Sequence, residues 1–152
     1  LDSSTKVMAM VKAFSYGSGS FEIANVLQYN HVDYLAVAYA DEGVELRRAG
    51  ITLPIMVMNP EQQSYDLMIQ NKLEPEIYSF KVFELFLKAL GRSGYKGSAY
   101  PVHLMIDTGM HRLGFEEEDL HKLIIQIKNN KLIKVKSVFS HLATADEPIH
   151  RL

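Results

Sequence analysis

Apolar runs of strand length recur six times along the chain, and longer segments of helical period separate them. Each run is nearly continuous in apolar character, as expected of strands that are buried on both faces of a parallel sheet. The runs are Val7 to Val11, Tyr34 to Ala38, Pro54 to Met58, Glu74 to Tyr78, Val102 to Ile106 and Ile133 to Phe139. Their alternation with helical segments predicts βα units arranged around a parallel sheet.

Residues typical of helix ends mark several segments between the runs. Asn59 and Pro60 predict the start of one helix, because an asparagine N-cap followed by a first-turn proline suits a helix N-terminus. Ser79 is placed to cap a second helix that ends at Gly91. In the segment Glu116 to Asn129, acidic residues fill the first turn and apolar residues recur on one face, which predicts an amphipathic helix.

The number of predicted strands limits the architecture. A closed (β/α)₈ barrel has eight βα units and takes about 250 residues, whereas this chain has 152 residues and six apolar runs. The sequence therefore predicts an α/β fold, a partial TIM-type barrel with about six of the eight parallel strands, in a single domain over residues 1–152. Because an open sheet of this kind leaves strand edges uncovered, we expect dimerisation, rearrangement or disordered segments, with a homodimer as the favoured outcome.

Composition and charge exclude several classes of function. The chain is 47% hydrophobic and 22% charged, has no long uninterrupted apolar stretch and carries no signal-peptide pattern at its start, so we expect a cytoplasmic protein that does not contact a membrane. With no cysteine, thiolate metal sites are excluded, and the histidines form no metal-binding motif. The net charge of -2 gives no reason to expect nucleic acid as a partner.

Lys12 follows the first apolar run and precedes a loop that contains Gly17 and Gly19. Functional residues of parallel βα sheets collect on the loops after the strands, and a lysine amine among apolar neighbours becomes more nucleophilic. Lys12 is therefore a candidate for covalent attachment to a carbonyl group. Equally, this segment alone is compatible with a lysine that extends its apolar stem along the rim of a strand.

Two further loops after strands contain Arg112 and His141. Arg112 offers a planar set of donors for a carboxylate or an oxyanion, although it is equally suited to a surface pair with Asp107 or Glu116. His141 is a candidate acid, base or flat surface for an aromatic ring, and its alternative is a structural hydrogen bond. His103 lies within a predicted strand and is expected in the core.

Five collinear motifs together resemble the N-terminal domain of the alanine racemases. That family carries VVKANAYGHG, LAVA with an acidic helix ending LRxAGI, PILVL, KxDTGMxRLG and SHLAxAD. The corresponding stretches of this chain are Val11 to Gly19, Leu35 to Ala38, Leu46 to Ile51, Pro54 to Met58, Asp107 to Gly114 and Ser140 to Asp146. The resemblance runs over nearly the whole chain.

The resemblance implies pyridoxal 5'-phosphate (PLP) as the cofactor and alanine as the substrate. Lys12 matches the lysine that binds PLP and serves as one of two bases, and Tyr16 matches the tyrosine that binds the cofactor phosphate. Arg112 matches the arginine that faces the cofactor oxygen and the substrate carboxylate, and His141 matches the imidazole against the pyridine ring. The implied activity interconverts L-alanine and D-alanine for bacterial peptidoglycan.

The chain departs from the family pattern at three positions. Met105 stands where the family often has a carbamylated lysine that braces the arginine, and a thioether cannot do this. Phe14 and Ser18 replace the usual Asn and His of the lysine loop, a variation similar to racemase domains fused to a cell-wall ligase. The family's second base comes from a C-terminal β-domain of the partner subunit, which these 152 residues do not include, so we expect little activity from them alone.

Two alternatives remain beside this interpretation. The chain is also compatible with a non-catalytic PLP-binding or interaction module of a larger fusion protein. A third possibility is another enzyme of the same barrel type, such as a decarboxylase, or a small PLP-carrier protein. The segments Asp107 to Gly114 and Ser140 to Asp146 favour the racemase.

Overall fold

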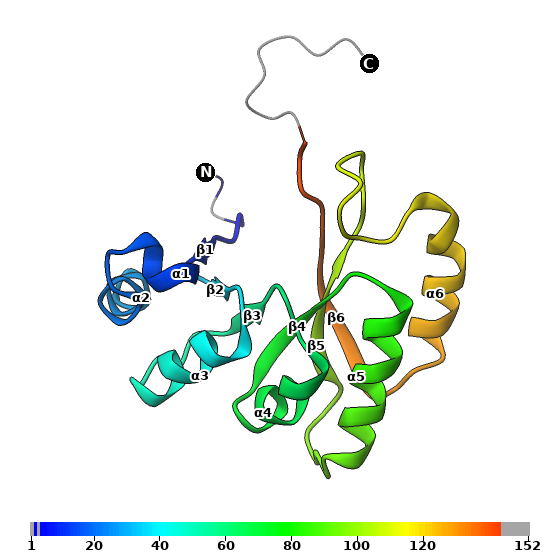
Figure 1. The fold of residues 1–152 in the computed structure, drawn as a ribbon, viewed down its shortest axis with the longest axis horizontal. Coiled ribbons are helices and arrows are strands. Elements are labelled where there is room, and N and C mark those ends of the chain that lie inside the picture. The colour runs from blue at the N-terminus through cyan, green and yellow to red at the C-terminus, as the bar shows by residue number, and fades with distance from the viewer. Residues whose placement is uncertain (1, 3, 144–152) are drawn as a thin grey trace, which may run out of the picture.

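The sheet contains six strands, all parallel, in the spatial order β1-β2-β3-β4-β5-β6. The structure is a computed structural model that describes residue 2 and residues 4–143. The strands are β1 (Met8–Met10), β2 (Tyr34–Val37), β3 (Ile55–Val57), β4 (Leu73–Ile77), β5 (Tyr100–Met105) and β6 (Ile133–Phe139). The sheet curves into a half-barrel (Figure 1), which confirms the predicted partial barrel of the TIM type.

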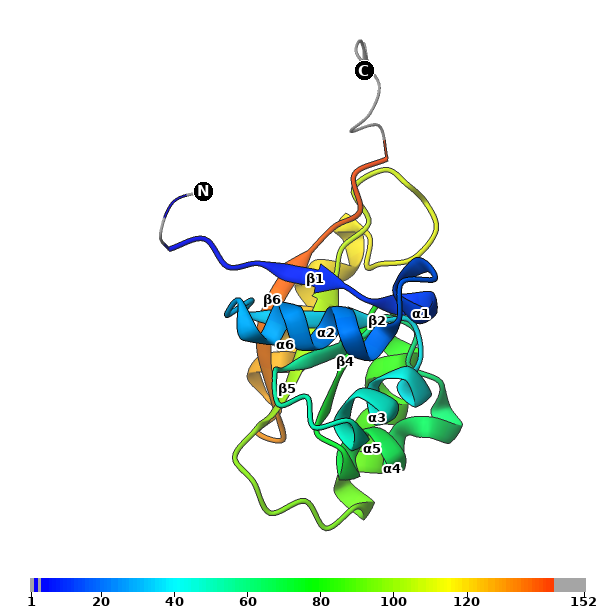
Figure 2. The ribbon, with the colours of Figure 1, turned by 90° about the vertical axis from the view of Figure 1, so that its left-hand side faces the viewer.

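Helices connect successive strands and cover the outer side of the curved sheet (Figures 1 and 2). They are α1 (Lys12–Tyr16), α2 (Ser20–Tyr29), α3 (Ala40–Arg48), α4 (Tyr65–Gln70), α5 (Phe80–Arg92) and α6 (Leu120–Lys128), with short 3₁₀ turns η1 (Gln62–Ser64) and η2 (Glu117–Asp119). None of the helices within the described residues is both long and apolar enough to span a bilayer.

The two faces of the sheet differ in chemistry. Side chains on the outer face, such as Leu35, Ile55 and Leu73, are fully buried in the core that packs beneath the helices. The inner face is partly polar, because Glu74 and Glu76 alternate with these outer residues along β4 and are also buried. Side chains two residues apart on a strand share a face, so the sequence places both glutamates inside the barrel.

The predicted helix start at Asn59 and Pro60 is wrong. The Asn59 N–H donates to the Ala38 carbonyl at 2.9 Å, so the residue extends the pairing between the ends of β2 and β3. The chain turns into η1 only at Gln62 and into α4 at Tyr65. The hydrogen bond to the neighbouring strand end thus delays the helix and leaves Asn59 at the carboxyl edge of the sheet.

The other two predicted helices are present with adjusted ends. Ser79 caps α5 as predicted, since its Oγ accepts the Val82 N–H at 3.3 Å. The helix does not end at Gly91 but runs to Arg92. The predicted helix Glu116 to Asn129 is divided into η2 and α6, because its acidic first turn winds as a 3₁₀ turn.

Candidate active site

The loop that begins with Lys12 follows a left-handed path. Four consecutive residues after the lysine have positive φ angles, namely Ala13 (51°), Phe14 (56°), Ser15 (51°) and Tyr16 (56°). A left-handed turn of residues other than glycine costs about 1–2 kcal/mol per residue, so the surrounding structure must stabilise it. The turn closes with the Gly17 and Gly19 N–H groups, which both donate to the Phe14 carbonyl, at 3.0 and 3.1 Å.

The Glu42 carboxylate holds this loop against the end of β2. Its Oε1 accepts the Ala13 N–H at 2.7 Å, and its Oε2 accepts the N–H groups of Ala38 and Tyr39 at 2.7 and 3.1 Å. Hydrogen bonds to a charged acceptor are stronger than neutral ones. Glu42, in the first turn of α3, therefore ties the residue after Lys12 to the end of β2.

A second loop carries Arg112 between β5 and η2. The Asp107 N–H donates to the Phe115 carbonyl and the Phe115 N–H donates to the Met105 carbonyl, both at 2.9 Å, which pinches the base of the loop. Gly114 permits this approach, because a Cβ at this position would lie 2.5 Å from the Asp107 nitrogen. The pinched base directs the intervening residues over the carboxyl end of the sheet.

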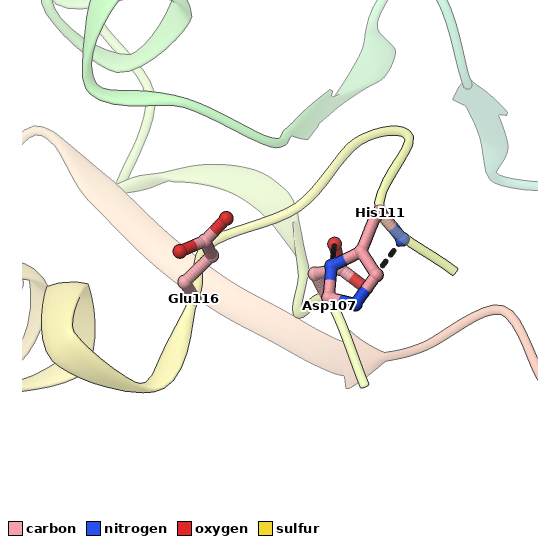
Figure 3. Close-up of side chains that lie close together, drawn as sticks. All are labelled: Asp107, His111 and Glu116. Carbon is pink, nitrogen blue, oxygen red and sulfur yellow. Dashed lines mark hydrogen bonds and ion pairs between the residues drawn. The ribbon is translucent and has the colours of Figure 1, made fainter. Parts of the chain in front are cut away.

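The same loop brings the side chains of Asp107, His111 and Glu116 near one another, with potential ligand atoms within 4.8 Å (Figure 3). Asp107 Oδ1 already accepts the N–H groups of Gly109 and His111, at 2.9 and 3.1 Å, which lowers the pKa of its carboxyl. Its Oδ2 lies 3.4 Å from His111 Nδ1. Because the Asp107 carboxylate is already bound within its own loop, we interpret this group of side chains as one that stabilises the loop conformation.

Arg112 does not take the surface-pair alternative within the described residues, since it forms no ion pair with Asp107 or Glu116. It lines a pocket of about 290 Å³ at the carboxyl ends of the strands, and Lys12 and His141 line the same pocket. The structure thus brings three of the four sequence-predicted site residues together. Tyr16 lies on α1 with 69% of its side chain exposed and does not line this pocket.

The segment around His141 is described only to residue 143, so Asp146 lies outside the described residues. Ser140 precedes the histidine and makes a hydrogen bond to the Thr108 hydroxyl from the loop after β5. This contact joins the end of β6 to the Arg112 loop. Ser140 is thus used in a contact between loops, whereas His141 lines the pocket.

Glu76 is a pocket residue that the sequence interpretation missed. It lines the same pocket, is 1% exposed, and its Oε2 has no hydrogen-bond partner. Burial raises the pKa of Glu76 to about 7, and the Arg112 charge acts in the opposite direction. The sequence feature that could have revealed Glu76 is the pair of acidic residues at alternating positions of an otherwise apolar strand.

Glu74, two residues earlier on β4, belongs to a different polar cluster. Its Oε2 lies 2.9 Å from His103 Nε2 and accepts the Tyr34 hydroxyl at 3.3 Å, while His103 Nδ1 lies 2.7 Å from Ser137 Oγ. His103 is 1% exposed, as expected for the core residue that the sequence indicated. We call these four side chains the lower cluster.

Fold and site together define a class of protein. A parallel half-barrel presents a primary amine, a guanidinium and an imidazole in one pocket at the carboxyl ends of its strands, where barrel enzymes carry their active sites. This arrangement suits a ligand that combines a carbonyl group with negative charge, because the amine can bond to the first and the guanidinium can bind the second.

Comparison with known proteins assigns the family. The family model described as "Alanine racemase, N-terminal domain" matches residues 1–151, and the chain belongs to this family. Alanine racemase 2 of Caldanaerobacter subterraneus is 39% identical over 147 residues, which cover 93% of this chain and 36% of the relative. The alanine racemase of Synechocystis is 36% identical, with 95% and 38% of the two chains covered.

Solved structures agree with this assignment. An alanine racemase of Clostridium difficile superimposes with a TM-score of 0.88 at 37% identity, covering 97% of this chain and 38% of that chain. The alanine racemase of Enterococcus faecalis (E. faecalis) gives the same TM-score at 31% identity, with 98% and 40% covered. The chain therefore spans about two fifths of the length of the relatives it matches.

Proposed function

We propose that this chain supplies the cofactor-lysine part of a PLP-dependent alanine racemase, which interconverts L-alanine and D-alanine in the bacterial cytoplasm for peptidoglycan synthesis. The observation that carries the proposal is the convergence of Lys12, Arg112 and His141 on one pocket from three separate loops. These residues are distant in sequence, and only the barrel topology makes them neighbours.

The donor set of the pocket fits PLP. Lys12 offers an amine to an aldehyde, Arg112 offers cationic donors to oxygen atoms, and His141 offers a flat ring. When bound, PLP withdraws electrons from the substrate α-carbon and so makes its proton acidic. Lys12, Arg112 and His141 would hold the cofactor in the pocket, and the Tyr16 hydroxyl is proposed to bind its phosphate.

Each of these side chains has a proposed part in handling the substrate. Lys12 Nζ accepts the α-proton on one face of the substrate and returns it there. Arg112 binds the substrate carboxylate and stabilises the negative charge that grows nearby. His141 would offer its flat ring to the ring of the bound cofactor. The left-handed turn and Glu42 set where Lys12 begins, so they support its orientation.

Racemisation also needs a second base on the opposite face, because a single base exchanges the proton on one face only. We propose that this base comes from a partner subunit of a homodimer. We expect residues 1–152 on their own to bind PLP at Lys12 but to give little or no turnover.

Chemical labelling tests the proposal directly. The protein that carries this chain is incubated with PLP, reduced with borohydride and digested, and the labelled peptide is identified by mass spectrometry. We expect the label at Lys12 and its loss in Lys12→Ala. The matched control is Lys6→Ala, since Lys6 is an exposed lysine near the same strand. A folded protein labelled elsewhere, or not labelled, contradicts the proposal.

Turnover separates the racemase from the non-catalytic module. With L-alanine as the substrate, we expect formation of D-alanine that Lys12→Ala abolishes and Lys6→Ala preserves. Labelling at Lys12 without turnover in the complete protein favours a module that binds PLP and catalyses nothing. Faster reaction with another amino acid favours a different enzyme of the same barrel type.

A further inference from the structure

The pocket that contains Lys12 has an uneven set of charges. Lys12 and Arg112 are basic residues, and Glu76 is the acidic residue among the described residues that line it. The two cations come from loops, whereas Glu76 comes from the middle of the sheet, on β4. The acidic side chain that the described residues supply to this pocket therefore comes from the sheet.

Glu76 has no structural use that explains its burial. The side chain is 1% exposed, and its Oε2 has no hydrogen-bond partner although it is shielded from solvent. An unsatisfied buried carboxylate is costly and is retained where a function requires it. His103, which pairs with Glu76 in the register of β4 and β5, is bound to Glu74 and Ser137 instead, and Met105 and Phe139, which also line the pocket, are apolar.

Arg112 lacks a protein partner on its own loop. Asp107, the nearest acidic residue in sequence, is occupied by the backbone of the loop and by His111. Met105, below the base of the loop, offers no charge. Arg112 lines the same pocket as Glu76 without forming an ion pair with it in the described part of the chain, and its charge opposes the effect of burial on the pKa of that carboxyl.

We propose that the Glu76 carboxylate is a positioning residue that holds the Arg112 guanidinium over the pocket, so that Arg112 meets the carboxylate of an α-amino acid substrate in one orientation. The inference rests on the proposed function. Glu76 does not touch the substrate in this proposal. It acts through Arg112.

The first test needs neither cofactor nor turnover. The Glu76 carboxyl is titrated by carbon-13 NMR in the cofactor-free protein, where we expect a midpoint near pH 7. Arg112→Met is expected to raise this midpoint by about half a pH unit or more, because a nearby cation favours the charged carboxylate. Lys12→Met is the matched control and is expected to shift it less.

Other titratable and charged groups around the pocket also influence the titration of the Glu76 carboxyl. They come from every element around the pocket: Lys12, Tyr39, Tyr78, His103, Arg112 and His141. If Arg112→Met leaves the midpoint in place, or if Lys12→Met moves it further, Glu76 is not the partner of Arg112 and the proposal is overturned.

The second test moves the carboxylate to another strand, in the complete protein that carries this chain. Glu76→Gln is expected to raise the Michaelis constant for alanine about tenfold, with a smaller change in kcat, because it loosens the group that binds the substrate carboxylate. Glu76→Gln with Met105→Glu returns a carboxylate to the pocket from the adjacent strand and is expected to recover part of the loss. Glu74→Gln, the same change on the same strand, is the control and is expected to leave the Michaelis constant within about twofold.

Outcomes for this proposal and for the proposed function are distinguishable. Borohydride labelling at Lys12 in Glu76→Gln reports cofactor attachment, and we expect it to persist. Absence of labelling at Lys12 in the unmodified protein contradicts the proposed function. Persistent labelling with an unchanged Michaelis constant in Glu76→Gln, or equal effects of Glu74→Gln and Glu76→Gln, overturns the role of Glu76 alone.

Discussion

Glu74 and Glu76 stand two residues apart on β4, point to the same side of the sheet and are both buried, yet their surroundings are opposite. Glu74 is bound by His103 and Tyr34 in the lower cluster, whereas Glu76 has an unpartnered oxygen at the edge of a pocket. A satisfied polar network rigidifies the barrel interior, whereas a buried carboxylate without a partner is costly. The difference separates a hydrogen-bonded layer of the barrel from a layer that lines the pocket.

Breaking the lower cluster is expected to cause the largest loss of stability. His103→Leu removes the imidazole between Glu74 and Ser137 and leaves a buried carboxylate with only the Tyr34 hydroxyl. Leaving a buried carboxylate without one of its hydrogen-bond partners costs about 1–3 kcal/mol, and we expect the upper part of that range. Urea unfolding monitored by circular dichroism measures the change. A loss below about 1 kcal/mol would show that the cluster is not structural.

Removing the Glu76 carboxylate is expected to raise the free energy of unfolding rather than lower it. The folded state raises the pKa of Glu76 from 4.5 to about 7, so the folded protein keeps the proton that the unfolded chain releases near pH 4.5. The free energy of unfolding therefore falls as pH rises through this window, by about 3 kcal/mol in total. Glu76→Gln removes this dependence and is expected to stabilise the protein at pH 8 by up to that amount.

Unfolding curves at several pH values between 4 and 8.5 test this second prediction. Glu74→Gln serves as the control, because its carboxylate already has partners. Parallel pH profiles for the unmodified protein and Glu76→Gln would contradict the prediction. Stabilisation combined with weaker substrate binding would show that the protein accepts a cost in stability to keep Glu76.

A third prediction concerns the loop that begins with Lys12, which lines the same pocket as Glu76. Glu42→Gln weakens the hydrogen bonds that its carboxylate accepts from Ala13, Ala38 and Tyr39, and charged hydrogen bonds of this kind are worth about 1.5–3 kcal/mol. We expect a loss of about 1–2 kcal/mol and slower labelling of Lys12 by PLP. Glu45→Gln on the exposed side of α3 is the control. Equal labelling rates in both variants would argue against a role of Glu42 in presenting the lysine.

The smallest effect is expected from Tyr34→Phe. This change removes the 3.3 Å hydrogen bond to Glu74 but keeps the edge-on packing of the ring against His103, whose centroid is 5.5 Å away. A single hydrogen bond contributes about 1 kcal/mol. Urea unfolding measures it, and a loss as large as that of His103→Leu would mean that Tyr34, rather than the imidazole, satisfies Glu74.

The sequence was informative wherever a local pattern decides the structure. All six apolar runs became strands, because a buried parallel strand needs a continuous apolar run, and their ends shifted by no more than two residues. Ser79 capped its helix, since a cap depends on residues a few positions apart. Lys12, Arg112 and His141 were placed at strand ends by position alone, and motif resemblance supplied their proposed roles.

Contacts between segments that are distant in the sequence could not be predicted from local patterns. The start at Asn59 and Pro60 failed because a hydrogen bond to Ala38, from the neighbouring strand, competes with the helix. The left-handed turn after Lys12 opposes the local preference of four residues and depends on Glu42 from another helix. No propensity predicts a conformation that a remote side chain stabilises.

The sequence by itself thus determined that β4 carries two inward carboxylates, because alternation along a strand is a local property. Only the tertiary structure decided that they differ. Glu74 is bonded to His103 of the adjacent strand, whereas Glu76, which pairs with the same residue in the backbone register, lines the pocket that Arg112 also lines. Register and partners arise from residues far away in the chain, so the distinction between support and site exists only in the folded protein.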